Sequence, residues 1–347
     1  MTRAVSYRLD VLRNGAYLTQ LYWDASSGAP TIDCRKDSAI KRSMSGTFTC
    51  NDAVDLFADE LRPMMIIDGI EEALGIYRPT TVLDTYTPYG KAWQVEAYDR
   101  SWILSSAKTE SLLHLAAGTN YIEAIEQLLV SCGIANAIIV ASDSELTSDR
   151  EDWPIGTAYL DIINSLLTEI NYKEVWFDGQ GYAHLEPYAA PSAASILRQY
   201  STRDMRRPSM GPELSGMTDL YSAPNVFVVT CSNPDNPAGL RAVAVNDSPV
   251  SSKSTLRRGM RITQVSSVNQ TSSQEALQGY ANRLRDESLL SDYTLDFDIL
   301  AEPGHGVGDI IGIDHPELGG IYEEQSWSLS LAAGEMMHIS ASRTVVI

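Results

Sequence analysis

The chain has 347 residues, of which 44% are hydrophobic and 20% are charged, so it is long enough for two or three domains with hydrophobic cores. It contains 26 Lys and Arg and 45 Asp and Glu, which gives a net charge of −19. This charge disfavours non-specific nucleic-acid binding, which depends on neutralising phosphates. No apolar run approaches the roughly 18–20 residues that span a bilayer, and the N-terminus leads into a polar strand pattern, so we expect no membrane insertion and synthesis in a cytoplasm.

The first block, residues 1–105, has the pattern of a strand-rich domain. Alternating residues at 7–12 and 17–23 flank Asn14-Gly15, a pair that favours a tight hairpin turn. Further strands are predicted at 40–50, 64–67, 80–86 and 92–98, with a short helical segment at 53–60. Many short strands separated by turn residues indicate a β-barrel or a sandwich.

The middle block, residues 106–188, changes to the period of helices. A first helix is predicted to begin near Asn120 and to end at Gly133, where glycine can take a left-handed cap. A strand follows at 137–141. A second helix, capped at Thr157, places these apolar residues on one side: Leu160, Ile163, Leu167 and Ile170. Two short strands around a turn at 178–181 complete a small α+β unit.

Residues 189–224 are predicted to be a linker into a second β domain, residues 225–347. The linker contains four prolines, which cannot sustain a helix or a central strand: Pro191, Pro208, Pro212 and Pro224. A strand is expected at 225–231, an exposed insertion at 232–254 and another strand at 261–265.

The last seventy residues form one continuous pattern. Ser272 and Glu275 make a capping box for an amphipathic helix at 273–290, which flanks the second β domain. From Tyr293 onward the side chains alternate with a period of two, as in a strand with one buried face. Strands are predicted at 293–300, 310–314, 326–331 and 336–346. Three glycines turn the chain between the first two of these strands: Gly304, Gly306 and Gly308.

This order of elements resembles the C-terminal barrel of bacteriophage tail hub proteins, a family related to the T4 baseplate hub and to the hubs of contractile injection systems. The matching residues near the C-terminus are Tyr280, Ala281, Leu284, Pro303, 308–311, 314–319 and 326–329. The resemblance extends to 62–69 and 74–75 in the first block. In the middle block it covers 154–157, 171–172, 176–181 and 186–188.

The resemblance implies a mainly β protein with an α+β insertion: two tail-tube-like β-barrel domains and a small α+β domain between them. It also implies a ring, usually a homotrimer, located in the virion at the tail tip or baseplate. The expected partners are the tail tube or distal tail protein, a tail spike or fibre-bearing protein, and the tape measure protein. DNA would pass through the lumen without specific binding.

Candidate chemical sites are few. His305, Asp309, Asp314 and His315 are the best metal candidates, because imidazole and carboxylate are usual ligands, but glycine and proline turns already explain two of them. The three glycines at 304–308 precede a strand, whereas a dinucleotide loop must open a helix. His184 and Glu186 share one face of a strand, where an ordinary polar role explains both.

Other side chains give no stronger signal. His114 and His338 have no evident partner, and the cysteines lie too far apart for a short zinc or redox motif: Cys34, Cys50, Cys132 and Cys231. These thiols are expected to be reduced and mostly buried. Tryptophans at strand positions favour core packing over a sugar groove: Trp93, Trp102, Trp153, Trp176 and Trp327. The basic cluster at 257–261 is too short to outweigh the acidic balance.

The sequence therefore favours a structural, non-enzymatic hub with no catalytic, cofactor or metal residues assigned. Two alternatives remain open, a tail-associated cell-wall hydrolase or peptidase and a carbohydrate- or receptor-binding module. The sequence contains neither G-x-S-x-G nor H-E-x-x-H, so the hydrolase alternative has no recognisable catalytic motif to support it. The acidic charge agrees with a channel wall that repels phosphate and equally with an ordinary soluble surface.

Overall fold

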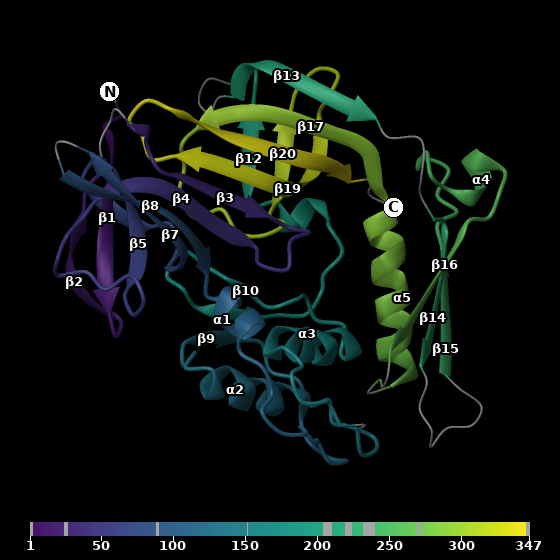
Figure 1. Ribbon diagram of the computed structural model, residues 1–347. Helices are drawn as coiled ribbons and strands as arrows, with labels where there is room; N and C mark the ends of the chain where they lie inside the picture. Colours follow the sequence, from purple (N-terminus) through teal and green to yellow (C-terminus); the bar gives the residue numbers. More distant parts are fainter. Residues whose placement is uncertain are drawn as a thin grey trace.

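A computed structural model describes residues 3–23, 27–87, 90–150, 152–203, 210–218, 224–231, 240–268, 271 and 273–344. The chain is mostly β, as expected. Its strands form one large, mainly antiparallel sheet and two three-stranded sheets, one beside helices α2 and α3 and one beside helix α5 (Figure 1). The large sheet is open and does not close into barrels.

The first block supplies eight strands to the large sheet. These are β1 (Val5–Arg13), β2 (Ala16–Leu21), β3 (Thr31–Arg35), β4 (Arg42–Thr49), β5 (Glu60–Ile67), β6 (Ile70–Ala73), β7 (Tyr77–Thr87) and β8 (Gly90–Asp99). Asn14 and Gly15 form the predicted hairpin turn, with φ of 52° and 76°. A bridge between Trp23 and Phe48 brings the chain after β2 back to β4, so these strands curl around a common core.

The predicted helix at 53–60 is wrong. Residues 52–53 and 56–58 form turns, and Glu60 already begins β5. Two aspartates replace the bonds that a helix would need: Asp55 accepts from the backbone N of Phe57, and Asp59 accepts from the backbone N of Asp55. Asp59 also pairs with Arg13 at 2.7 Å, which fixes the turn against β1.

The middle block contains α1 (Ser101–Ser106), α2 (Tyr121–Ser131), β9 (Ala137–Ile139), α3 (Tyr159–Glu169), β10 (Trp176–Phe177) and β11 (Ala183–Leu185). The Asn120 side chain caps α2, as predicted. The cap of α3 is Ala158, one residue after the predicted Thr157, whose hydroxyl donates to the carbonyl of Pro154. This unit has a core of its own, largely Leu and Ile from α2 and α3.

The segment 189–224 is more than a linker. After the short 3₁₀ helix η2 (Ala193–Ser195), β12 (Arg198–Ser201) pairs with β18 (Ile310–Asp314), and β13 (Met210–Thr218) pairs with β17 (Leu290–Leu300). Pro212 lies in β13, an end strand of the sheet that the described residues form, where the register with β17 shifts; a missing N–H is tolerated at such edges and bulges.

The next strands form a separate module, not the start of the large sheet. It contains β14 (Val226–Cys231), β15 (Leu240–Val245), α4 (Thr255–Arg258), β16 (Thr263–Val268) and α5 (Gln274–Ser288). Residues 240–245 are therefore a strand paired with β14, which corrects the expectation of an exposed insertion. Helix α5 begins after Ser273, whose hydroxyl accepts from the backbone N of Ala276; the predicted cap Ser272 lies outside the described residues.

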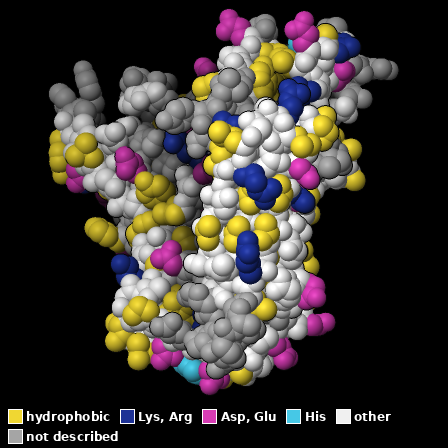
Figure 2. All heavy atoms as spheres, turned by 90° about the vertical axis from the view of Figure 1, so that its right-hand side faces the viewer, with side chains coloured by type: hydrophobic (Ala, Val, Ile, Leu, Met, Phe, Trp, Pro, Cys, Tyr) yellow, Lys and Arg dark blue, Asp and Glu magenta, His cyan; other side chains and the backbone are white. Residues whose placement is uncertain are grey.

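Helix α5 covers one face of this small sheet and leaves the other open. Leu277 and Ala281 of α5 pack on a small core with Val229 of β14. On the opposite face, Val243 and Val265 are aligned across the strands and are exposed. Figure 2 shows this side of the molecule, where hydrophobic, Lys and Arg side chains lie among the acidic ones. On this face, acidic side chains are therefore interspersed with basic and apolar ones.

The final strands are β17 (Leu290–Leu300), β18 (Ile310–Asp314), β19 (Gly320–Ser330) and β20 (Met336–Thr344). The predicted alternation holds in β17, where Leu295, Phe297 and Ile299 are buried. Strand β19 pairs with β20 along its length, with β18 near its start and with β3 near its end. The β19–β3 pair joins the strands of the two halves into one sheet with a shared core.

The helices within the described part of the chain are too short or too polar to cross a membrane.

Replacing Gly308 with valine is expected to destabilise the protein. Gly308 has a φ of 70°, which valine resists, and its added Cβ would lie 3.1 Å from Oε1 of Glu323. We expect a loss of about 1–3 kcal/mol in the free energy of unfolding, measured by urea denaturation. Gly308→Asn is the matched control, because asparagine tolerates this backbone region better. An unchanged midpoint for Gly308→Val would contradict the assignment.

Candidate functional site

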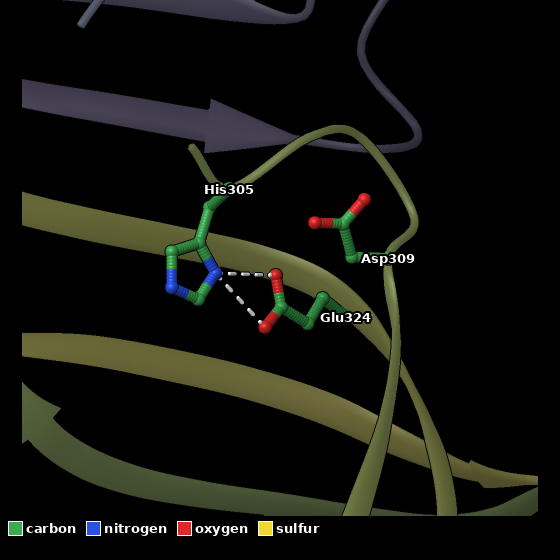
Figure 3. Close-up of side chains that lie close together, drawn as sticks. All are labelled: His305, Asp309 and Glu324. Carbon is green, nitrogen blue, oxygen red and sulfur yellow. Dashed lines mark hydrogen bonds and ion pairs between the residues drawn. The ribbon is translucent and has the colours of Figure 1, made fainter. Parts of the chain in front are cut away.

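The loop at 301–309, between β17 and β18, carries a cluster of buried polar groups. His305 is buried, and its Nδ1 lies 3.0 and 3.1 Å from the two carboxylate oxygens of Glu324 in β19 (Figure 3). Both side chains are only 1% exposed. The other ring nitrogen lies 3.5 Å from the hydroxyl of Tyr200, and burial raises the pKa of that hydroxyl.

Glu324 reaches the core because β19 changes partner at this point. The register with β20 shifts between Glu324 and Ser326, which is the signature of a bulge. Before the shift β19 pairs with β18, and after it β19 pairs with β3. A carboxylate is buried at this switch, where the His305 ring provides its partner.

Asp309 holds the other end of the loop. Its carboxylate accepts from the backbone N of Gly306 at 2.9 Å and from the guanidinium of Arg198 at 2.7 Å. Arg198, in β12, also donates to the carbonyl oxygen of Gly304 at 2.7 Å. The loop is therefore fixed to the segment that the sequence suggested was a linker.

The same loop is bonded to the first half of the chain. Arg42 of β4 donates to the carbonyl oxygen of His305 at 2.6 Å, and its guanidinium lies 5.4 Å from the centre of the Trp327 ring. The indole N–H of Trp327 donates to the carbonyl of Gly306 at 3.2 Å, and the thiol of Cys34 lies 3.8 Å from the same oxygen. Burial raises the pKa of the Cys34 thiol to about 11, so this cysteine stays protonated.

A cavity of about 220 Å³ lies beside this loop. All three parts of the chain line it: Arg42, Glu72 and Leu74 from the first block, Trp176 and Asp178 from the middle unit, and Glu302, His305 and Trp327 from the last strands. Residues from all three parts of the chain therefore surround this partly polar cavity.

The predicted metal candidates are only partly brought together. His305, Asp309 and Glu324 place ligand atoms within 4.8 Å of one another, which is a geometry that a metal ion could use. The three groups already have protein partners, however, since His305 bonds to Glu324 and Asp309 to Arg198. The site is thus explained as a network that fixes the loop.

The other predicted metal ligands, Asp314 and His315, lie elsewhere, and the sequence did not point to Glu324, which belongs to the cluster. Asp314 accepts from the hydroxyl of Ser201, and the ring of His315 accepts from the backbone N of Leu318 within its own turn. Glu324 was missed because nothing in the sequence distinguishes a buried glutamate from a solvated one. The only available signal was its position just before the apolar strand at 326–331.

The remaining histidines have separate partners. His184 stacks on Trp176 at 4.0 Å and bonds to Asp178, whereas Glu186 bonds to Lys173 and to the Trp176 indole, so His184 and Glu186 do not act as a pair.

His114 and His338, for which the sequence showed no partner, face Asp152 at 2.7 Å and Asp298 at 2.8 Å. The second pair sits directly across β17 and β20, a register that the sequence does not reveal.

The aromatic and thiol predictions agree with the structure in outline. Trp327 is buried, and these four tryptophans are half-buried: Trp93, Trp102, Trp153 and Trp176. The four cysteines form no disulfide bond; Cys34 and Cys231 are buried, and Cys50 and Cys132 are half-buried. The glycine turn at 304–308 leads into strand β18, so it offers no helix N-terminus for a dinucleotide.

No protein-family model matches the sequence, and no curated protein matches it by sequence. Solved structures match over nearly the whole chain. A tail protein from Neisseria meningitidis MC58 has a TM-score of 0.67 and 13% identity over 97% of each chain. The 43 kDa tail protein of prophage MuSo2 from Shewanella oneidensis has a TM-score of 0.65 and 11% identity over 97% of this chain and 98% of that one.

The chain has the fold of prophage tail proteins. A third example is the prophage tail protein gp18 from Listeria monocytogenes EGD-e, with a TM-score of 0.56 and 13% identity over 96% of this chain and 94% of that one. The resemblance to phage tail proteins inferred from the sequence is confirmed at the level of the fold. The likeness covers whole chains and includes the inserted middle unit and the α5 module.

Removing the partner of His305 is expected to weaken the fold. Glu324→Ala would leave a buried ring nitrogen without an acceptor, at a cost of about 1–3 kcal/mol in the free energy of unfolding. Denaturation in urea measures the change. Glu335→Ala, which removes an exposed glutamate from the turn before β20, should change the free energy by less than about 0.5 kcal/mol. Equal stability of the two variants would contradict the role of the His305–Glu324 pair.

Proposed function

We propose that this protein is the structural hub of a phage tail tip or baseplate. In this proposal a ring of three copies ends the tail tube, attaches the spike or fibre proteins and lines the channel for DNA. The observation that carries the proposal is the match to tail proteins over 97% of both chains. Such a match includes every unit of the chain and is not a shared single domain.

The sheet supports the idea of two tube-like units in each chain. One curled set of strands runs β2-β1-β5-β7-β8-β4-β3, with β6 paired to β5, and the other contains β12, β18, β19, β20, β17 and β13. The first set has eight strands and the second has six, and the β19–β3 pair joins them. In the proposal each set is a tail-tube-like domain, so three chains supply six units around the channel. We propose domain boundaries near 105 and 188, with the second unit beginning within 189–224, because β12 and β13 already belong to it.

The ends of the large sheet suit a ring. Strands β2 and β13 lie at its two ends, and an end strand offers backbone groups to a neighbouring chain. A head-to-tail contact between two different ends of one chain generates a ring when the rotation closes. We propose that such contacts assemble the homotrimer.

The partners follow from the position proposed for the ring in the virion. One face would meet the tail tube or the distal tail protein, and the other would meet a spike or fibre-bearing protein. The lumen would hold the end of the tape measure protein until DNA passes. The buried polar groups around His305 have protein partners that fix a loop, which favours a structural role over an enzymatic one.

The mass in solution tests the ring. Light scattering of the purified chain should show trimers, or trimers should form when the distal tail protein is added. Val229→Asp in the core of the α5 module should unfold that module, whereas Met217→Lys in β13 should reduce assembly and keep the monomer folded, because Met217 is an exposed side chain of an end strand and lysine disfavours pairing at a sheet edge. A monomer alone and with tail partners would contradict the hub proposal.

The acidic balance gives a separate prediction for the channel. If carboxylates face the lumen, they repel phosphate at distances shorter than the screening length of roughly 8 Å at physiological salt. An image of the assembled tail would identify these carboxylates, and replacing them with lysine should leave assembly intact and slow DNA ejection. Normal ejection by the lysine variants, or a neutral or basic lumen, would show that the negative charge serves only solubility.

A further inference from the structure

Arg42 is a buried cation without a direct counter-ion. The residue is 3% exposed, its Nε has no hydrogen-bond partner, and no Asp or Glu of the described residues forms an ion pair with its guanidinium. Asp99 accepts from the backbone N of Arg42 at 3.1 Å, and it attracts the guanidinium without forming an ion pair with it. Burial raises the pKa of the Asp99 carboxyl.

A buried, unpaired guanidinium is unfavourable unless an anion meets it. Arg42 lines the cavity of about 220 Å³ beside the 301–309 loop. Its guanidinium also contacts the carbonyl of His305, the face of the Trp327 ring and the thiol of Cys34, none of which is an ionised carboxylate. The cavity is therefore the place from which an external anion would reach the guanidinium.

The walls of the cavity limit the size and polarity of that anion. Trp176, Trp327, Leu329 and Met337 give it apolar and aromatic sides. Its volume is below the roughly 300–1,000 Å³ typical of pockets for larger ligands. A ligand of a few heavy atoms with an apolar body fits these walls.

The charge around the cavity limits the charge of the anion. Glu72, Asp178 and Glu302 also line it. Asp178 is bonded to His184, and Glu302 lies 3.4 Å from the hydroxyl of Tyr200, so both are held in place. Three carboxylates around one guanidinium disfavour phosphate or any other multiply charged anion. A single carboxylate meets Arg42 with the least repulsion.

We infer that this cavity binds a monocarboxylate with a small apolar group, which Arg42 holds through its guanidinium. The C-terminal end of a polypeptide chain and a free organic acid both carry this chemistry. Arginine is suited to it because its planar fork matches a carboxylate. This binding site does not depend on the proposed hub function, because it is inferred only from Arg42 and the lining of the cavity.

Three probes of similar size test the inference by calorimetry on the full chain. N-acetyl-leucine imitates a chain end, 4-methylpentanoate is a free organic acid, and N-acetyl-leucinamide has the same body without the carboxylate. We expect at least one acid to bind with a Kd in the millimolar range or below and the amide to bind at least tenfold more weakly. The acid that binds with the lower Kd shows whether the ligand is the end of a polypeptide chain or a free organic acid.

Variants connect binding to the cavity. Arg42→Gln should weaken acid binding at least tenfold. Glu72→Gln should strengthen it about two- to fivefold, because one repelling carboxylate is removed. Glu71→Gln is the matched control, since Glu71 is the adjacent residue of β6, pairs with Arg8 and does not line the cavity.

The inference is overturned if neither acid binds, if the amide binds as well as the acids, or if a folded Arg42→Gln variant keeps its affinity. Thermal melting shows whether Arg42→Gln is folded. Should that variant fail to fold, Glu72→Gln decides, because an affinity equal to that of Glu71→Gln would place any binding outside this cavity.

Discussion

The pairing of β19 with β3 is the contact on which the rest of the large sheet depends. Strand β19 is long enough to pair first with β18 and then with β3, and a bulge after Glu324 separates the two stretches. Without the second stretch, the strands of residues 1–105 and those near the C-terminus would be two open sheets. Their apolar faces form one core, with residues such as Leu9 and Leu329 in the same cluster, so neither half can bury its face alone.

The polar network at the 301–309 loop fixes the position of the two halves of the sheet relative to each other. Apolar packing between sheets tolerates sliding. In contrast, buried hydrogen bonds from Arg42 and Trp327, together with an exposed one from Arg198, to backbone carbonyls of one loop fix a single position. The cost of burying Glu324 is offset only when His305 lies beside it. The same arrangement leaves the guanidinium of Arg42 facing a cavity, which links the architecture to the proposed ligand.

The middle unit and the α5 module are attached at a second place. Arg283 of α5 donates to the carbonyl oxygen of Tyr172 at 2.7 Å and lies over the ring of Tyr188 at 5.1 Å. Lys41, from the turn between β3 and β4, reaches Glu174 of the middle unit at 2.6 Å. Each unit keeps its own core, so these polar contacts set the arrangement of the units while apolar burial forms each one.

The sequence by itself determined the local elements with strong periodicity or turn chemistry. The hairpin at Asn14-Gly15, the α2 helix after Asn120, the alternation in β17 and the helix before it all follow from short-range rules. The resemblance to tail hub proteins also came from the sequence and agrees with the fold. In contrast, the short helix at 53–60 failed because aspartate side chains replaced helix bonds, an outcome that propensity does not encode.

Only the tertiary structure decided which strands share a sheet and which polar groups meet. Strands β12 and β13 arose in a proline-rich segment because partners far along the chain offered paired edges. Strand β15 instead pairs with β14, the strand before it, in a separate module. Glu324, Arg198 and Arg42 lie far from His305 in the sequence or in different strands, and their meeting depends on long-range register. Local sequence fixes the period of an element, but the partner of a strand depends on burial across the whole molecule, which no short window contains.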